Sequence, residues 1–291
     1  MFVITTPTGQ IGGQVVDRVL DAGHPVRLIA RDPGRLSPEV RERVEVVQGS
    51  HTDPGVLMAA FAGAEGVFWV IPPDHRTVDL ERHYLDPTRS ACEALVANGV
   101  DRVVSVSTMG RGIEKNAGHL SAARAAEELI AATGVKSRAL RPPFFMENLL
   151  RQVDAIKSRG TFFLPSDRDR TLALVATRDI AARGAELLLD GSWSGQGGVP
   201  VVSPDSLTPD GMAEVVSEVL ERTVRYQQLP LDAYKSMMLD NGASEASAQG
   251  VADMAVAQNE GAYDEEHRTA RPSPTGFRQW CEEVLRPAVL A

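Results

Sequence analysis

The sequence predicts an α/β protein with a doubly wound, mainly parallel sheet, helices on both faces, and a smaller C-terminal portion. Two observations predict it. Short β-branched runs alternate with amphipathic helical stretches through the first half of the 291 residues. A glycine-rich turn also joins the first apolar run to the first helical stretch. Parallel strands need long crossover connections, and helical stretches of this length fill them.

The elements of the first half follow from hydrophobic period and from turn residues. The apolar runs are continuous instead of alternating, which is typical of parallel strands covered on both faces. The last helical stretch of this half is rich in alanine and glutamate and stops at Gly134. The expected strands are residues 2–4, 26–30, 44–47, 67–71, 103–106 and 137–140, and the expected helices lie at 15–20, 54–63, 78–98 and 119–133.

The alternating rhythm ends at the pair Pro142-Pro143. We therefore expect two domains. Residues 1–142 form the doubly wound domain, and residues 143–291 form a mixed α/β C-terminal portion that caps it.

Four segments of this C-terminal portion carry a clear pattern. Residues 199–202 and 223–228 resemble strands in composition. Residues 239–261 are rich in Ala, Ser and Asn with an apolar stripe, which predicts a helix pair or a mobile lid, and the pattern does not decide between the two. Residues 275–285 place apolar side chains at helical spacing, which predicts a terminal helix docked on the body.

Composition narrows the function classes. The 30 Lys and Arg against 39 Asp and Glu give a formal charge of -9, which disfavours direct binding to nucleic acid or to an anionic membrane. No apolar run reaches the roughly 18 residues of a membrane span, and the chain opens on a strand-like run instead of a leader. The two cysteines, Cys92 and Cys281, and the scattered histidines have no metal-ligand spacing, so no metal site is expected. These features predict a cytoplasmic protein with a small-molecule substrate, and they leave a homodimer open.

The turn after the first strand has the composition of a phosphate-binding loop. It runs from Thr5 to Gly13 and leads directly into a helix. Small residues let backbone amides approach a pyrophosphate, and the positive end of the helix favours its charge. Gly12 would let the helix pack closely on the strand. Thr6 departs from the pattern, because it stands where the first glycine of a dinucleotide fingerprint is expected. A plain strand-to-helix turn is the alternative.

The end of the second strand predicts which dinucleotide is bound. A fold that prefers NAD ends this strand with an acidic residue that binds the ribose hydroxyls. Here Arg31 comes first, and a guanidinium binds a 2′-phosphate with charge-assisted bonds, which favours NADP(H). Asp32 is either a ribose ligand or the N-cap of a short helix that begins at Pro33, and the cap is the preferred interpretation.

Several motifs together resemble the NmrA-like branch of the atypical short-chain dehydrogenases. The first loop reads TTPTGQIGG and the second strand ends with Arg-Asp-Pro. Matching blocks follow the later strands, and the resemblance extends over nearly the whole chain. These blocks are VFWVIPP at 67–73, VSVSTMG at 104–110, RPPFFMEN at 141–148, TRDIA at 177–181 and FRQW at 277–280.

The resemblance implies a Rossmann domain that carries NADP(H) and a C-terminal portion that closes a substrate cleft. The residues implied to bind the cofactor are Thr8, Gly9, Gln10 and Ile11 at the pyrophosphate, Arg31 at the 2′-phosphate, Ile71 and Pro72 at the adenine-side ribose, and Ser107, Pro143 and Phe144 near the nicotinamide. Phe145, Met146 and Asn148 are implied to face the substrate, with ordinary core packing as the alternative for Phe145 and Met146.

Catalytic side chains are less evident. Short-chain dehydrogenases use a Tyr-x-x-x-Lys pair, which this sequence lacks. Relatives that reduce double bonds or quinones often carry a lysine near Ala123, where this chain has alanine followed by Arg124. His119 is the candidate proton donor because the ordinary pKa of histidine is near neutrality. As an alternative, His119 is a solvated residue at a helix start.

We expect an NADPH-dependent reductase of a small aromatic, quinone-like or enone molecule. The alternatives are a non-enzymatic NADP(H)-binding redox sensor that acts through a protein partner, and a redox-neutral enzyme on the same scaffold. The missing Tyr and Lys favour the sensor. The RPPFFMEN block and the terminal cap favour the enzyme, because sensing alone does not need a substrate pocket.

Overall fold

The computed structural model describes residues 1–113 and 116–291. In this part of the chain, seven parallel strands form the central sheet in the order β10-β6-β5-β4-β1-β2-β3. The doubly wound fold class is confirmed. The strands are β1 (Phe2–Ile4), β2 (Val26–Ala30), β3 (Val44–Gln48), β4 (Gly66–Trp69), β5 (Arg102–Val106), β6 (Lys136–Arg141) and β10 (Gln196–Pro200).

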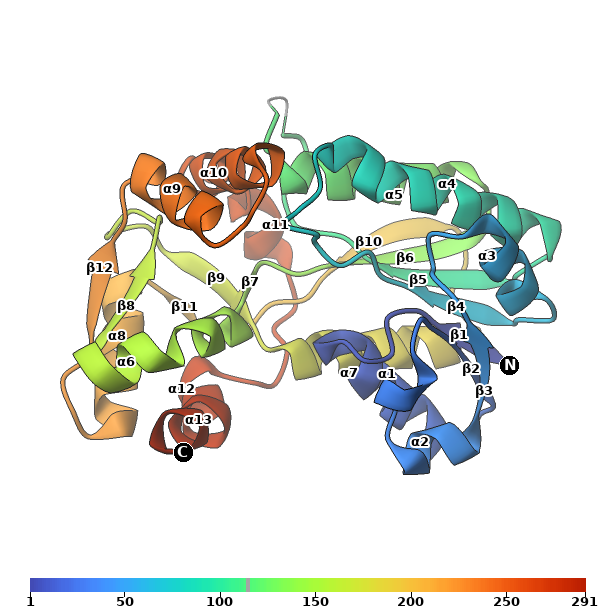
Figure 1. Ribbon diagram of the computed structural model, residues 1–291, viewed down its shortest axis with the longest axis horizontal. Coiled ribbons are helices and arrows are strands. Elements are labelled where there is room, and N and C mark those ends of the chain that lie inside the picture. Colours follow the sequence, from blue (N-terminus) through green and yellow to red (C-terminus); the bar gives the residue numbers. More distant parts are fainter. Residues whose placement is uncertain (114–115) are drawn as a thin grey trace.

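Helices cover both faces of this sheet, as Figure 1 shows. Alternate residues of β1 explain why the strands are apolar throughout: Phe2 and Ile4 pack into the cluster of one face, and Val3 into that of the other. The helices of the first face are α1 (Gln10–Asp21), α2 (Pro38–Arg43) and α7 (Thr177–Leu189), and those of the second are α3 (Pro54–Phe61), α4 (Leu80–Ala97) and α5 (His119–Ala132).

Two elements of the doubly wound unit come from beyond residue 142. Strand β10 pairs with β6 along its whole length, with Gln196 opposite Ser137 and Pro200 opposite Arg141. Helix α7 packs beside α1 and lies so close to the sheet that a Cβ on Gly184 would be 2.7 Å from the Phe68 ring of β4. A division of the chain at residue 142 stays a proposal, and in space these two elements lie with the first unit.

The remaining elements form the second lobe in Figure 1. Its two small sheets have the orders β11-β9-β7 and β12-β8. Among the residues described, no helix has the length and apolar character that a bilayer crossing requires. The short turn η1 (Pro33–Arg35) follows β2 in the first unit. The elements of the second lobe are β7 (Phe144–Phe145), β8 (Thr161–Leu164), β9 (Leu172–Val175), β11 (Ser206–Leu207), β12 (Arg225–Gln228), α6 (Val153–Arg159), α8 (Pro209–Leu220), α9 (Leu231–Asp240), α10 (Glu245–Asn259), α11 (Asp264–Thr269), α12 (Phe277–Trp280), α13 (Arg286–Leu290), the short turn η2 (Met146–Gln152) and the π-helical turn η3 (Cys281–Leu285).

The terminal helix docks as predicted. Phe277, Trp280, Cys281 and Leu285 are fully buried in the hydrophobic cluster of the C-terminal lobe. The indole Nε1 of Trp280 donates to Glu147 Oε1 at 3.1 Å. That carboxylate also accepts from the backbone N–H of Thr177 at the start of α7, at 3.0 Å. One acidic side chain therefore ties the end of the chain to a helix of the central sheet.

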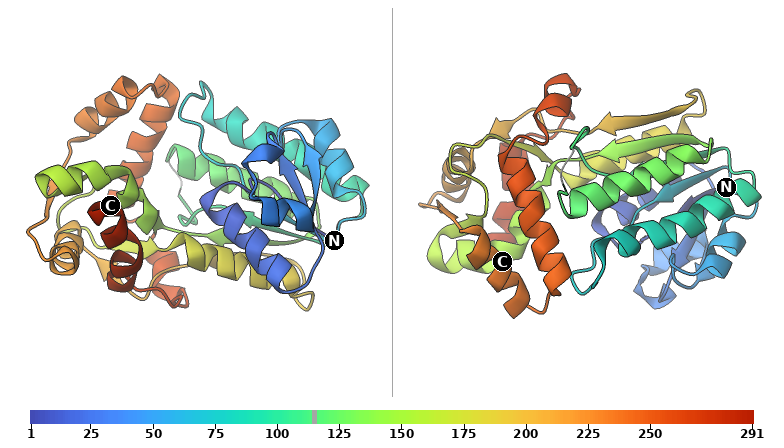
Figure 2. Two further views of the ribbon diagram at one scale, coloured as in Figure 1. Left: turned by 60° about the horizontal axis from the view of Figure 1, so that its bottom comes forward. Right: turned by 90° about the horizontal axis from the view of Figure 1, so that it is seen from above.

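The segment 239–261 is helical and holds the whole of α10 with the last two residues of α9, so the first helix of the predicted pair begins earlier, at Leu231. The hydroxyl of Ser244 caps α10 by accepting from the Ser247 N–H at 3.0 Å. The backbone N–H of Ser244 donates to the His75 carbonyl at 2.8 Å, which fixes the helix to the loop after β4. Helix α10 contacts α4 and α5, and Figure 2 shows it from above beside them.

Candidate functional site

The loops that carry the predicted cofactor residues meet at one edge of the sheet. Because the strands are parallel, the loops after β1, β2, β4, β5 and β6 all leave from their carboxyl ends. The strand order reverses between β4 and β1, which is where ligands bind in open α/β sheets. Thr8, Arg31, Ile71, Ser107 and Pro143 all follow these strand ends.

The first loop is held in the shape of a phosphate-binding turn. Thr6 has a φ of 51°, in the left-handed region that favours glycine. The hydroxyl of Thr5 donates to the Phe68 carbonyl at 3.1 Å and accepts from the Val70 N–H at 3.0 Å, which joins the ends of β1 and β4. Thr6 thus adopts the conformation expected of the fingerprint glycine that it replaces.

The start of α1 is built for close approach and is left uncapped. A Cβ on Gly12 would lie 2.3 Å from the Thr6 carbonyl oxygen, so only glycine fits there, as the sequence predicted. No side chain caps the helix at Gly9, and its first turn holds no acidic residue. Thr8, Gly9 and Gln10 are exposed, and the Ile11 side chain is buried in the core. The first turn therefore presents free backbone donors and a positive helix end, which fits a pyrophosphate.

The second strand ends in a cation without a partner. Arg31 is exposed and makes no hydrogen bond or ion pair with the described residues. The carboxylate of Asp32 accepts from the Gly34 N–H at 2.9 Å and so caps η1. The capping interpretation of Asp32 is confirmed. Arg31 therefore fits a 2′-phosphate, and Asp32 has another role.

The loop after β4 leaves the sheet beside the first loop, because β4 pairs with β1. Ile71 is half-buried against α3 and α4, and Pro72 is exposed. The Pro72 carbonyl lies 2.9 Å from Nε2 of His83 in the first turn of α4. This contact joins the loop to α4, and its role toward the adenine-side ribose stays a prediction.

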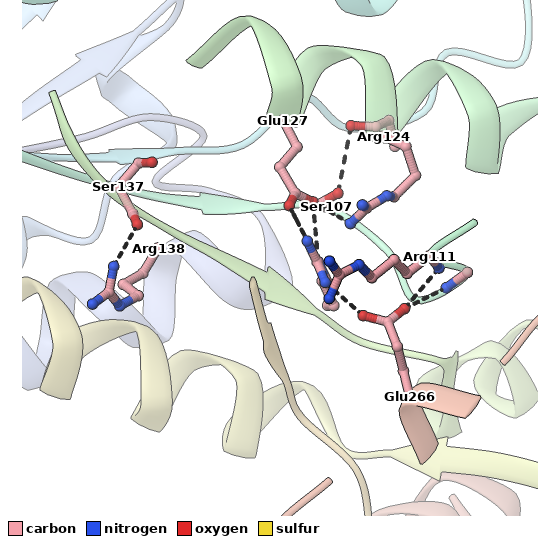
Figure 3. A network of polar contacts seen from close by, with 10 residues as sticks. Ser107, Arg111, Arg124, Glu127, Ser137, Arg138 and Glu266 are labelled. Carbon is pink, nitrogen blue, oxygen red and sulfur yellow. Dashed lines mark hydrogen bonds and ion pairs between the residues drawn. The ribbon is translucent and has the colours of Figure 1, made fainter. Parts of the chain in front are cut away.

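A buried charge network supports the loop after β5, shown in Figure 3. Arg141 at the end of β6 pairs with Glu127 of α5 at 2.5 Å and with Glu266 of α11 at 2.6 Å. Glu127 also pairs with Arg124 at 2.7 Å. Two cations and two anions thus balance each other beneath the loop.

Glu266 holds the loop directly. Its Oε2 accepts from the backbone N–H groups of Gly110 at 2.8 Å and of Arg111 at 2.9 Å. Burial opposes ionisation, but the Arg111 amide and the Arg141 guanidinium together keep the pKa of Glu266 below its usual range. Sequence analysis did not find Glu266, since it stands 125 residues beyond Arg141 and belongs to no motif.

Ser107, Pro143 and Phe144 lie at the same end of the sheet. Ser107 is nearly buried; its backbone N–H donates to Leu140 at 2.8 Å and its hydroxyl to the Ala123 carbonyl at 3.4 Å. Pro143 is buried, and Phe144 is half-buried against the C-terminal cluster. Their roles toward a nicotinamide stay predictions.

The implied substrate residues differ in exposure. Phe145 and Asn148 are half-buried. Met146 is completely buried in the C-terminal cluster, as the packing alternative predicted. Met146 is therefore not exposed to a ligand, and the roles of Phe145 and Asn148 toward a substrate stay predictions.

His119 lies in the interior, so its interpretation as a solvated residue at a helix start is wrong. It is only 7% exposed, and its Nδ1 lies 3.3 Å from the Tyr84 hydroxyl. Burial, with the charges of His75 and His83, lowers the pKa of His119 to about 4. His119 was predicted as a proton donor because the ordinary pKa of histidine is near neutrality, and this reason does not hold at the buried position.

Comparisons with known proteins agree with this geometry. The sequence model of the NmrA-like family matches residues 1–280. Over 242 residues the chain is 32% identical to a (4-alkanoyl-5-oxo-2,5-dihydrofuran-3-yl)methyl phosphate reductase of Streptomyces griseus, and the match covers 82% of this chain and 80% of that relative.

Two solved structures share the fold over nearly the whole chain. One is a nucleoside-diphosphate-sugar epimerase from Staphylococcus aureus, with a TM-score of 0.82 at 15% identity, covering 97% of this chain and 99% of that one. The other is an NADPH-dependent quinone oxidoreductase from Escherichia coli in complex with NADPH, with a TM-score of 0.80 at 20% identity, covering 98% and 99%. The family match and the S. griseus relative together extend over most of the sequence, and the chain therefore belongs to the NmrA-like family.

Proposed function

We propose that the protein is an NADPH-dependent reductase of a small molecule with a conjugated carbonyl group, such as a quinone or an enone. The observation that carries the proposal is the pairing of an uncapped helix start at Gly9 with an unpartnered cation at Arg31. The first fits a pyrophosphate and the second a 2′-phosphate. Both features bind anions, so they would have no function in an enzyme whose only ligand is neutral.

The names of the relatives support the reaction class. The S. griseus relative is a reductase of a 5-oxo-2,5-dihydrofuran, a ring whose double bond is conjugated with a carbonyl. The E. coli structure is that of a quinone oxidoreductase. Both names describe electron-poor double bonds, which accept hydride without a strong acid at the carbonyl oxygen. This chemistry suits a chain that lacks the Tyr-x-x-x-Lys pair.

When bound, NADPH supplies the hydride. The residues of this chain bind and orient the cofactor and the substrate. In this proposal the amides from Thr8 to Ile11 hold the pyrophosphate, Arg31 holds the 2′-phosphate, and Ile71 and Pro72 pack on the ribose. Ser107, Pro143 and Phe144 border the nicotinamide, and Phe145 and Asn148 face the substrate.

The proton that completes the reduction comes from solvent in this proposal. His119 is buried, its pKa is lowered to about 4, and its Nδ1 is already engaged with Tyr84. A neutral, enclosed imidazole is a weak acid at neutral pH. We therefore assign His119 a structural role between α4 and α5, and the His119→Ala variant is expected to reduce stability more than the chemical rate.

The test combines binding with turnover in the same sample. Calorimetric titration with NADPH and with NADH is followed by a panel of quinones and enones, with the absorbance of the reduced cofactor recorded. Tight NADPH binding and oxidation by at least one panel member supports the proposal. The Gly9→Asp variant, which places a carboxylate at the pyrophosphate, serves as the binding-deficient control. NADPH binding with no oxidation by any compound contradicts the reductase and favours a sensor or a redox-neutral enzyme.

A further inference from the structure

A second basic side chain lies beside Arg31 at the adenosine end of the site. Arg31 follows β2, and His51 follows β3 three residues after its last residue, Gln48. Ala30 and Gln48 pair at the ends of the two parallel strands, and the Gly49 N–H donates to the Ala30 carbonyl at 3.0 Å. The two side chains thus start from adjacent, hydrogen-bonded strand ends.

The position of His51 is fixed by packing. Its ring meets the Trp69 ring edge to face, with centroids 6.1 Å apart. It is partly buried, and its ring nitrogens make no hydrogen bond with the described residues. His51 is therefore held in place by an aromatic contact, while both polar atoms stay available to a ligand.

The charges around His51 are positive. Arg31 and His83 are the ionisable groups in the described chain that act on it, and both lower its pKa. The carboxylates nearby in sequence are engaged elsewhere, since Asp32 caps η1 and Asp53 caps α3 through the N–H groups of Gly55 and Val56. Burial contributes most, and together these effects lower the pKa of His51 to about 4. Among the described residues, the charged groups that act on His51 are thus both basic, and the nearby carboxylates are bound to backbone N–H groups.

We propose that His51 is a second ligand of the cofactor's 2′-phosphate, beside Arg31, and takes up a proton from solvent when the phosphate binds. The inference rests on the proposed NADPH site. Without a phosphate the charge of Arg31 opposes protonation of His51. A phosphate dianion between the two side chains attracts both, which favours the imidazolium. NADH lacks this phosphate and leaves His51 neutral. His51 therefore adds more to the preference for NADPH over NADH at pH 6 than at pH 8.

The experiment measures proton uptake directly. Calorimetric titrations at pH 6 in two buffers of different ionisation enthalpy give the number of protons taken up with NADPH and with NADH. The cofactor cannot be the source of uptake, because a phosphate whose second pKa is near 6 releases protons when it binds a cation. The measured exchange with NADPH is the uptake by His51 minus the release by the phosphate. We therefore expect the wild type to take up more protons with NADPH than His51→Gln does, and the two proteins to behave alike with NADH.

A matched control variant distinguishes the effect of losing His51 from the effect of losing any histidine. His24 also meets an aromatic ring edge to face, that of Phe2 at 5.4 Å, but it precedes β2 and lies at the opposite edge of the sheet. His24→Gln is expected to retain the wild-type uptake. Thermal unfolding of both variants checks that they are folded, and a cross-peak titration of the His51 ring by NMR follows the same proton in the wild type.

The possible outcomes separate the role of His51 from the proposed NADPH site. Equal proton exchange with NADPH in the wild type and in His51→Gln overturns the role of His51 and leaves the cofactor site standing. Absence of NADPH binding to the wild type overturns both.

Discussion

Replacing Gly12 by alanine tests whether the first loop and α1 fit together as tightly as the structure indicates. The new Cβ would lie 2.3 Å from the Thr6 carbonyl oxygen and 2.9 Å from that of Thr5. Both atoms belong to backbone, and Thr6 is held in a left-handed conformation. The loop must therefore move by about 1 Å to reach ordinary van der Waals contact, since no flexible side chain can turn aside.

The expected free-energy change is the difference of two effects. Overpacking of this kind costs about 1–3 kcal/mol. Alanine in a helix is more favourable than glycine by about 1 kcal/mol, which offsets part of that loss. The net destabilisation is about 0–2 kcal/mol, and it falls on the loop that is proposed to hold the pyrophosphate.

Gly13 provides the matched control in the next position of the same helix. A Cβ there would lie 3.1 Å from the Pro7 carbonyl oxygen, which a small adjustment relieves. Gly13→Ala should therefore be neutral or stabilising, and Gly12→Ala should unfold at lower urea concentration and bind NADPH at least ten-fold more weakly. Equal stability and equal affinity of the two variants would show that the close approach at Gly12 is not as described.

Three further predictions concern single side chains at the same edge of the sheet. Arg31→Ala should weaken NADPH binding by about 1.5–3 kcal/mol, the contribution of a hydrogen bond to a charged group, and should leave NADH binding nearly unchanged. Equal losses for the two cofactors in calorimetry would contradict the assignment of Arg31 to the 2′-phosphate. Thr6→Gly should alter the free energy of unfolding by less than about 1 kcal/mol. Glycine removes the strain of the left-handed φ of 51°, but it also raises the conformational entropy of the unfolded chain. A larger loss of stability in urea denaturation would show that packing of the Thr6 side chain stabilises the fold. His119 has a folded pKa of about 4, below its ordinary 6.5, so its contribution to stability is complete above pH 6.5 and is lost as the pH falls toward 4. From pH 7 to pH 5 the wild type should lose about 2 kcal/mol more than His119→Asn, and parallel pH profiles would indicate that the imidazole is not buried in its neutral form.

The fold was predictable because it rests on local regularities. Each of the patterns used is contained in a short stretch of sequence: the continuous apolar runs, the helical periodicity and the Gly-rich turn. The sheet with its flanking helices follows from these patterns. The Asp32 cap was predictable for the same reason, since its partner Gly34 stands two residues away. The terminal helix could be recognised from the spacing of Phe277 and Trp280.

What escaped prediction depends on contacts between distant parts of the chain. The sequence marks residues near 199–202 as strand-like, but it does not say that β10 completes the sheet beside β6. Glu266 reaches Gly110 and Arg141 from a helix without a motif. The burial of His119 likewise depends on Tyr84 and on α10, which packs over the start of α5, and neither is encoded near the histidine itself.

The interleaved path of the chain limits how the protein can be recombined. A fragment that ends at residue 142 would lack the edge strand β10 and would uncover the face on which α7 lies, with Phe68, Val104 and Leu140 turned to water. Chimaeras with related enzymes that exchange everything after residue 142 must rebuild this face at α7 and β10. A graft that changes substrate choice is better confined to the second lobe, with residues 177–200 kept from the parent that supplies the sheet.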